Sequence, residues 1–310
     1  MTTVGSDVLA SIGNTPLVRL TKLPSADGAE VWAKVEGANP TGSMKDRMAL
    51  SMIEGAERRG ELKPGWRVVE YTGGSTGSSL AFVCAAKGYR SHFVSSDAFA
   101  EEKLRTMRAF GATVEIIPSE DRKITKELIA AIVARARELA AEPETFWTDQ
   151  FNNPDNRAGY HGMAEETLRQ AEGRVDAFVT AAGTGGCFSG NAEVLKKRLP
   201  GIQCVAVEPA TSRHLSGGVI ASHRIEGIGP GFVPKGMRMD LVDRVVAISS
   251  EDAYATARAL AVKEGIFAGI SSGANVLAST QLAKELGPGH RVVTVLVDSG
   301  LKYLQGDLFA

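Results

Sequence analysis

The strongest constraint on the fold is a repeated unit: a short apolar run leads into a glycine-rich turn and then into a helical pattern. It occurs where residues 67–71 run into the turn at 72–77 (TGGSTG), and again where residues 177–182 run into the turn at 183–186 (GTGG). Repeated strand–turn–helix units are typical of parallel sheets covered by helices. The sequence therefore predicts an α/β protein.

The same alternation continues along the chain. We expect strands at residues 31–35, 67–71, 91–95, 113–117, 177–182, 204–207 and 291–297. We expect helices at residues 47–59, 78–87, 101–110, 125–140, 157–171, 189–198, 251–264 and 274–286. Glycine after the helices and Ser, Thr or Asp before them fit capping preferences. Two clusters of this alternation predict two similar lobes, with functional residues at the carboxyl ends of strands and often between lobes.

Composition excludes several classes of function. The 35 basic and 36 acidic side chains give no basic excess, which argues against nucleic-acid binding. The apolar runs are too short to span a membrane, and the N-terminus lacks the pattern of a secretory signal. Cys84, Cys187 and Cys204 form no CxxC pair, and the five histidines lack metal-ligand spacing. We therefore expect no metal site, and a reducing, cytoplasmic location.

The segment at 182–187 (AGTGGC) is a candidate phosphate-binding loop. Its glycines let backbone N–H groups approach an anion, and the helix that follows adds its positive end. Two alternatives stay open. Glu208 lies where a dinucleotide-binding fold places its ribose-binding acid, although the spacing of Gly183, Gly185 and Gly190 does not match G-x-G-x-x-G. The loop is otherwise a tight turn without a ligand.

Lys45 is the second candidate, because it stands at the start of a helical pattern. Lysine is disfavoured at the positive end of a helix, so its position there suggests a special pocket; the alternative is an ordinary surface lysine. A desolvated lysine is nucleophilic toward an aldehyde. A phosphate loop together with such a lysine suggests pyridoxal phosphate, which carries an aldehyde and a phosphate.

Seven segments in order resemble the cysteine synthase/cystathionine β-synthase family of tryptophan-synthase-β-like, fold type II pyridoxal phosphate enzymes. They are residues 11–18 (SIGNTPLV), 39–47 (NPTGSMKDR), 72–77 (TGGSTG), 149–154 (DQFNNP), 182–187 (AGTGGC), 226–234 (EGIGPGFVP) and 269–274 (GISSGA). The resemblance spans nearly the whole chain. It implies a homodimer of two-lobed subunits, each lobe a three-layer α/β/α arrangement with a mostly parallel sheet, and the cofactor in the cleft between lobes. The larger, cofactor-binding lobe would comprise residues 1–42 and 148–310, and the smaller, mobile substrate lobe residues 43–147.

The resemblance also implies roles for single residues. Lys45 would bind the cofactor covalently and then transfer protons as the catalytic residue. The other cofactor-binding residues would be Ser75, Gly183, Thr184, Gly185, Gly186, Cys187 and Ser271, with Ser271 at the ring nitrogen. The substrate-binding residues would be Thr72, Gly73, Gly74, Ser75, Thr76, Gln150 and Gly227.

The activity implied is β-replacement on an activated L-serine such as O-acetylserine, through an aminoacrylate intermediate, with sulfide or another small nucleophile. Ser271 would place a neutral hydroxyl at the ring nitrogen, so the ring would withdraw less charge than it does beside a carboxylate. A carbanion at Cα would then more readily expel a β leaving group. One alternative is a lyase or dehydratase of the same fold that releases a 2-oxo acid and ammonia. Another is a protein that has lost activity and binds partners, against which intact Lys45 argues.

Three positions depart from the family pattern. The substrate loop usually reads T-S-G-N-T-G, so Gly73 lacks a hydroxyl and Ser75 replaces a longer amide. We expect Gly73 to make room for a larger substrate or nucleophile, and the altered loop to disfavour docking of a serine acetyltransferase tail. Cys187 replaces a threonine, and we favour a small loop residue over a reactive thiol.

Overall fold

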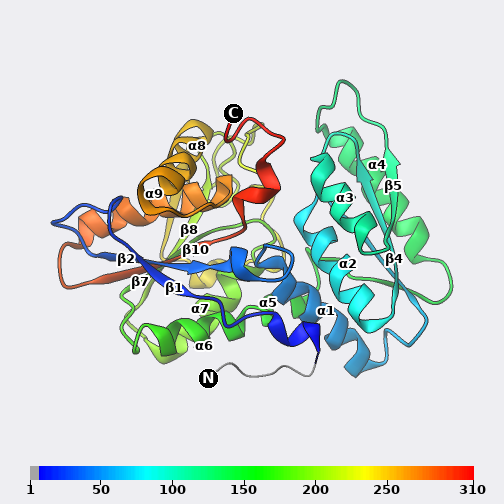
Figure 1. Cartoon of the computed structure of the whole chain (residues 1–310), viewed down its shortest axis with the longest axis horizontal. Helices are drawn as coiled ribbons and strands as arrows, with labels where there is room; N and C mark the ends of the chain where they lie inside the picture. Colours follow the sequence, from blue (N-terminus) through cyan, green and yellow to red (C-terminus); the bar gives the residue numbers. More distant parts are fainter. Residues whose placement is uncertain (1–6) are drawn as a thin grey trace. The chain divides into compact units, whose positions relative to one another are not determined.

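The computed structural model describes residues 7–310, and within them the chain divides into two compact units (Figure 1). The first unit is Lys45–Asn156 together with residues 7–12, and the second is Gly13–Met44 with Arg157–Ala310. Both units are built from strands and helices in alternation, which confirms the predicted α/β class. No helix within residues 7–310 is both long enough and apolar enough to cross a bilayer.

The first unit contains a parallel sheet with strand order β5-β4-β3-β6. Its strands are β3 (Arg67–Tyr71), β4 (Arg90–Ser96), β5 (Thr113–Ile117) and β6 (Thr145–Trp147). Its helices are α1 (Lys45–Arg59), α2 (Ser75–Lys87), α3 (Glu101–Ala109) and α4 (Lys126–Ala140). Helix α4 covers one face, where Val69 and Val94 pack against Leu128 and Ile132, while α2 and α3 cover the other (Figure 1). Because helices cover both faces, Val68 and Val69 of β3 and Phe93 and Val94 of β4 are fully buried in the inner strands.

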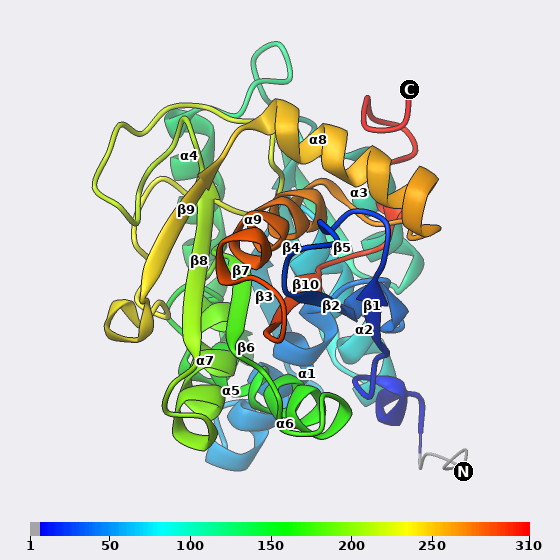
Figure 2. The ribbon, with the colours of Figure 1, turned by 90° about the vertical axis from the view of Figure 1, so that its left-hand side faces the viewer.

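The second unit contains a sheet with strand order β1-β2-β10-β7-β8-β9, in which only β1 runs antiparallel to its neighbour. Its strands are β1 (Leu17–Leu20), β2 (Glu30–Val35), β7 (Ala177–Ala181), β8 (Gln203–Pro209), β9 (Arg244–Ile248) and β10 (Arg291–Leu296). Its helices are α6 (His161–Gln170), α7 (Gly186–Arg198), α8 (Ser250–Ala259) and α9 (Ile270–Leu286). Helices α8 and α9 cover one face, and α6 and α7 the other (Figure 2).

The structure corrects several predicted elements. The helix expected at 157–171 is two helices, α5 (Pro154–Ala158) and α6, because the chain turns at Gly159 and Tyr160. The helix expected at 251–264 ends as α8 and continues as one π-helical turn, Leu260–Glu264. The short edge strands β1, β6 and β9 were not predicted. Three helices, α2, α7 and α9, begin three or four residues earlier than expected, because their first turns contain Gly, Ser or Thr, which have low helix propensity.

Asn275 joins helix α9 to two strands of the second unit. Its Oδ1 accepts a hydrogen bond from the backbone N–H of Ala181 (2.8 Å), and its Nδ2 donates to the carbonyl of Val295 (2.8 Å). One turn earlier, the Ser272 hydroxyl accepts from the backbone N–H of Val297 (2.9 Å). These fully buried side chains fix the start of α9 at the carboxyl ends of β7 and β10.

Replacing Asn275 with alanine should therefore destabilise the protein strongly. The Ala181 N–H and the Val295 carbonyl would lose buried partners, which costs about 2–4 kcal/mol in total. The matched control is Ser279→Ala in the same helix, because that hydroxyl bonds only the carbonyl of Asn275. Urea unfolding measures both. A loss below about 1 kcal/mol for Asn275→Ala would contradict this role.

Candidate functional site

Lys45 is buried at the start of α1, with 8% of its surface exposed. The chain reaches it through a turn in which Gly42 has φ +74° and donates its N–H to the carbonyl of Asn39 (2.8 Å). Met44, the residue before the lysine, donates its backbone N–H to the carbonyl of Val297 (2.9 Å). The alternative of an ordinary surface lysine is therefore excluded.

The loop at 72–77 is narrow and held by its own side chain. The Thr72 hydroxyl accepts hydrogen bonds from the backbone N–H groups of Gly74 and Gly77, both at 3.1 Å. Gly74 has φ +154°, and a Cβ there would lie 2.3 Å from Cδ of Lys103. The glycine is required, both by its backbone angle and by the lysine side chain beside it. Helix α2 begins directly afterwards at Ser75.

Two of the predicted substrate-binding side chains meet in this unit. The Thr76 hydroxyl donates to Oε1 of Gln150 (2.8 Å), and Nε2 of Gln150 donates to the carbonyl of Tyr71 (3.1 Å). Both Thr76 and Gln150 are buried. They lie at the carboxyl ends of β3 and β6, the edge at which parallel sheets carry their functional groups.

Gly73 does not open space for a larger ligand, contrary to the sequence expectation. A Cβ at this position would lie 2.7 Å from Cε1 of Phe99, 2.9 Å from its Cδ1 and 3.2 Å from its Cζ. Phe99 lies in the loop after β4 and packs against the cluster that contains Val69 and Val94. Its ring occupies the room that glycine leaves.

A double-mutant cycle tests whether the Phe99 ring fills the space beside Gly73. Gly73→Ser should cost about 1–3 kcal/mol, because the new Cβ collides with Phe99. In the Phe99→Ala background the same change should cost much less, since the ring is gone. Gly162→Ser in α6 is the control, because nothing lies within 4 Å of that position. Additive effects of the two substitutions in thermal unfolding would refute the contact.

In the second unit, the loop at 182–186 is a backbone cradle. A Cβ on Gly183 would lie 2.3 Å from the carbonyl oxygen of Gly227, and one on Gly185 within 2.7–2.8 Å of Met237. Gly185 is the N-cap of α7 with φ +81°, and it offers no capping side chain. The Gly186 N–H donates to the Thr184 hydroxyl (3.4 Å), and no side chain of the N-cap residue binds the other N–H groups of the first turn, an arrangement that suits an anion.

The dinucleotide alternative fails at Glu208. This fully buried carboxylate accepts hydrogen bonds from the backbone N–H of Leu215 (2.7 Å) and from the Ser216 hydroxyl, and it lies 3.8 Å from Nδ1 of His214. Its oxygens thus hold the loop that follows β8. They do not point to a ribose-binding role.

Ser271 and Cys187 complete the predicted cofactor-binding residues. Ser271 lies in the first turn of α9 with 2% of its surface exposed. Cys187 is buried in the first turn of α7, and its carbonyl accepts from Nδ2 of Asn191 (2.8 Å). All three cysteines are buried, and none of them forms a disulfide. Burial raises the pKa of both Cys84 and Cys204 to about 12.

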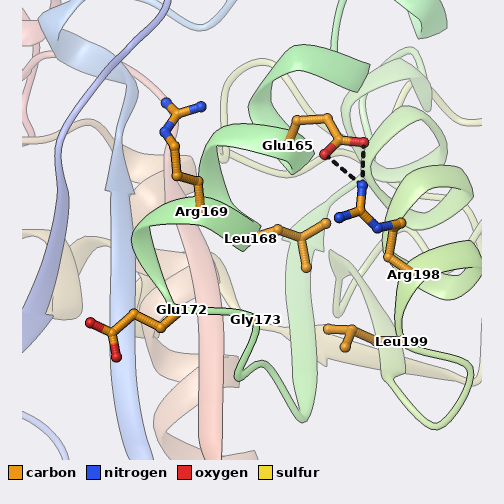
Figure 3. Close-up of a pocket in the computed structure, with 7 residues that line it drawn as sticks. All are labelled: Glu165, Leu168, Arg169, Glu172, Gly173, Arg198 and Leu199. Carbon is orange, nitrogen blue, oxygen red and sulfur yellow. Dashed lines mark hydrogen bonds and ion pairs between the residues drawn. The ribbon is translucent and has the colours of Figure 1, made fainter.

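A surface hollow of about 580 Å³ lies elsewhere in the second unit, at the ends of α6 and α7 (Figure 3). Its lining includes the ion pair between Glu165 and Arg198 (3.1 Å), with Arg169 and Glu172 nearby. These charges balance, and none of the predicted site residues lines it. Within residues 7–310 no cluster of His, Cys, Asp and Glu side chains could hold a metal ion.

The model of the family described as "pyridoxal-phosphate dependent enzyme" matches residues 8–298, almost the whole chain. The chain belongs to this family. Its cofactor is pyridoxal phosphate, and the chemistry of the observed groups fits it: a loop without side chains suits a phosphate, a buried hydroxyl at Ser271 suits a ring atom, and a buried lysine suits an aldehyde.

The chain is also similar to individual proteins of known sequence or structure. The chain is 42% identical to a cysteine synthase of Staphylococcus aureus (strain N315) over 301 residues, 96% of this chain and 95% of the relative. The crystal structure of O-ureido-L-serine synthase is 37% identical with a TM-score of 0.93, covering 99% of this chain and 96% of its own. A hydrogen sulfide-producing enzyme (Fn1220) from Fusobacterium nucleatum is 38% identical with a TM-score of 0.92, covering 98% and 99%.

Sequence reasoning missed the residues that support these loops. Phe99, Asn275 and Met237 lie outside the glycine motifs that carry the pattern, and no spacing rule marks them. Asn275 offers the nearest thing to a signal, because it is the one polar residue in the segment 273–278 (GANVLA). Such residues are found only when the packing is known.

Proposed function

We propose that the chain replaces the β substituent of an activated L-serine, with O-acetyl-L-serine as the substrate type and sulfide or another small nucleophile as the second reactant. The observation that carries the proposal is the 42% identity to a cysteine synthase along 96% of the chain. The β-replacement class, which serves amino-acid biosynthesis, is common to the cysteine synthase relatives.

Each group then has a defined task. Lys45 would hold the cofactor covalently through its Nζ and, once released, take the proton from the substrate Cα. Gly183, Thr184, Gly185, Gly186 and Cys187 would hold the phosphate, and Ser271 and Ser75 would contact the ring. When bound, pyridoxal phosphate supplies the conjugated ring that withdraws electrons from Cα.

The substrate carboxylate would bind at the loop 72–76 and at Gln150, with Gly227 lining the pocket. The support is local geometry: Thr76 and Gln150 are hydrogen-bonded to each other, and the N-cap of α2, Gly74, has no side chain to cap the helix. Gln150 also holds the carbonyl of Tyr71, which fixes its amide. A fixed amide beside a helix start is suited to orient a carboxylate.

The second candidate is β-elimination, in which the β substituent leaves and water completes the release of a 2-oxo acid and ammonia. The similarity to a hydrogen sulfide-producing enzyme favours it. Replacement and elimination share the first half of the reaction. They differ in whether a nucleophile reaches Cβ before the product leaves.

Product analysis separates the two candidates. We expect purified enzyme with O-acetyl-L-serine and sulfide to form cysteine in excess of pyruvate, measured by mass spectrometry. Lys45→Ala should lower turnover by about 10³-fold or more, because no other group would move the Cα proton. Lys123→Ala, at an exposed loop lysine, is the matched control and should keep full activity. Pyruvate as the main product would establish elimination, and no turnover of any activated serine would refute both.

We also propose a cytoplasmic homodimer. The family resemblance supports the homodimer. The sparse cysteines, which are all buried and form no disulfide, support the cytoplasmic location. Light scattering on purified protein measures the oligomeric state directly.

A further inference from the structure

Glu70, a residue without an assigned task in the proposed reaction, is a carboxylate buried in the sheet of the first unit. It lies on β3 with none of its surface exposed. Among residues 7–310 no lysine, arginine or histidine forms an ion pair with it. A buried unpaired charge is costly unless hydrogen bonds compensate it.

Four donors provide that compensation. Oε2 accepts from the Thr148 hydroxyl (2.6 Å) and from the backbone N–H of Gln150 (2.9 Å). Oε1 accepts from the backbone N–H of Tyr71 (2.8 Å) and from the indole N–H of Trp147 (3.3 Å). Three of the four can only donate, so the arrangement suits the ionised carboxylate.

The Glu70 carboxylate accepts hydrogen bonds beyond the point where the backbone pairing between β3 and β6 ends. Strand β6 pairs with β3 only as far as Trp147 opposite Val69, and Thr148 makes the last backbone bond, to the carbonyl of Val69 (3.2 Å). Asp149 then turns away with φ +44°, an unfavourable angle for a residue with a side chain. Oε2 of Glu70 binds the residues on both sides of this turn and holds it closed.

We infer that Glu70 is a positioning residue for the substrate carboxylate, acting through the backbone of Gln150 in its ionised form. The inference rests on the proposed function, in which Gln150 and the loop at 72–76 bind that carboxylate. Glu70 fixes Gln150 at its N–H, while Thr76 and the Tyr71 carbonyl fix its amide. Protonation of Oε2 would remove the acceptor for the Gln150 N–H, and the Thr148 hydroxyl could turn to the carbonyl of Val69 (3.5 Å).

The charge state of Glu70 can change near neutral pH. Burial raises the pKa of Glu70 to about 7, against the opposing effect of its four hydrogen bonds. The titratable groups beside it are Tyr71, whose pKa burial and the Glu70 charge hold above its usual value, and Asp149 in the turn. On the neighbouring strand β4, His92 lies opposite Val69 and pairs with Glu115. Above pH 7 the carboxylate is ionised and Gln150 is held; as the pH falls through 7 this hold is lost.

The test compares two amines that differ only in a carboxylate. L-Alanine has no β leaving group, and ethylamine is the same molecule without the carboxylate. Titration of the wild-type holoenzyme at pH 8, followed by the visible absorbance of the cofactor, should show tighter binding of alanine. In Glu70→Gln the affinity for alanine should fall by about tenfold or more, while that for ethylamine stays unchanged. Thr148→Val should give a smaller loss in the same direction.

A pH series gives the second readout. Because a group of pKa about 7 is about one-tenth ionised at pH 6, the wild-type preference for alanine over ethylamine should fall about tenfold between pH 8 and pH 6. In Glu70→Gln the preference should be flat. Glu115→Gln, at a half-exposed glutamate of the same sheet that pairs with Arg135, is the matched control and should behave as wild type.

The outcomes are distinct. If Glu70→Gln keeps the wild-type preference and its pH dependence, or loses only cofactor content and thermal stability, Glu70 is not a positioning residue. If Glu70→Gln fails to fold, the wild-type pH series and Thr148→Val decide in its place. If the wild type itself does not distinguish alanine from ethylamine, the proposed carboxylate site is wrong, which is a failure of the proposed function.

Discussion

Close backbone packing without side chains is the constraint on which the loop at 182–186 of the second unit depends. Gly183 lies against the carbonyl of Gly227, and Gly185 against the backbone of Met237, so neither position has room for a Cβ. The same loop leaves strand β7 one residue after Ala181, whose N–H is held by Asn275 of α9. The position of the loop at 182–186 and that of the start of α9 are thus both set by one buried amide. In the proposed function these two places would hold the phosphate and the ring of the cofactor.

In the first unit, polar side chains and not close backbone packing hold the loops in place. In the loop at 72–77, the Thr72 hydroxyl accepts hydrogen bonds from the backbone N–H groups of Gly74 and Gly77 and so holds the turn. The segment that carries Gln150 lies past the end of an edge strand of three residues, and a buried carboxylate replaces the missing ladder. Both loops are built on carboxyl ends of parallel strands, where the sheet is rigid and the chain that follows is free to vary.

Much of this arrangement could be predicted from the sequence, and the rest could not, for physical reasons. The strands at 67–71 and 113–117 coincide with β3 and β5, because each follows a glycine, Gly65 or Gly111, and contains several β-branched residues. Edge strands such as β6 carry too short a pattern to recognise. The starts of α2, α7 and α9 were predicted too late, because Gly, Ser and Thr near these starts have low helix propensity. In the folded protein, tertiary contacts override this local preference. At the site, Lys45 is buried as a special pocket requires, whereas the room expected at Gly73 is taken by Phe99, a residue 26 positions away in sequence.

The most direct measurement of the central claim is the site of covalent attachment of the cofactor. Borohydride reduction of the purified holoenzyme, followed by proteolysis and mass spectrometry, should place a pyridoxyl phosphate group on the peptide that contains Lys45, and on no other lysine. A reduced adduct on a different lysine, or a protein that carries cofactor without any reducible linkage, would contradict the account.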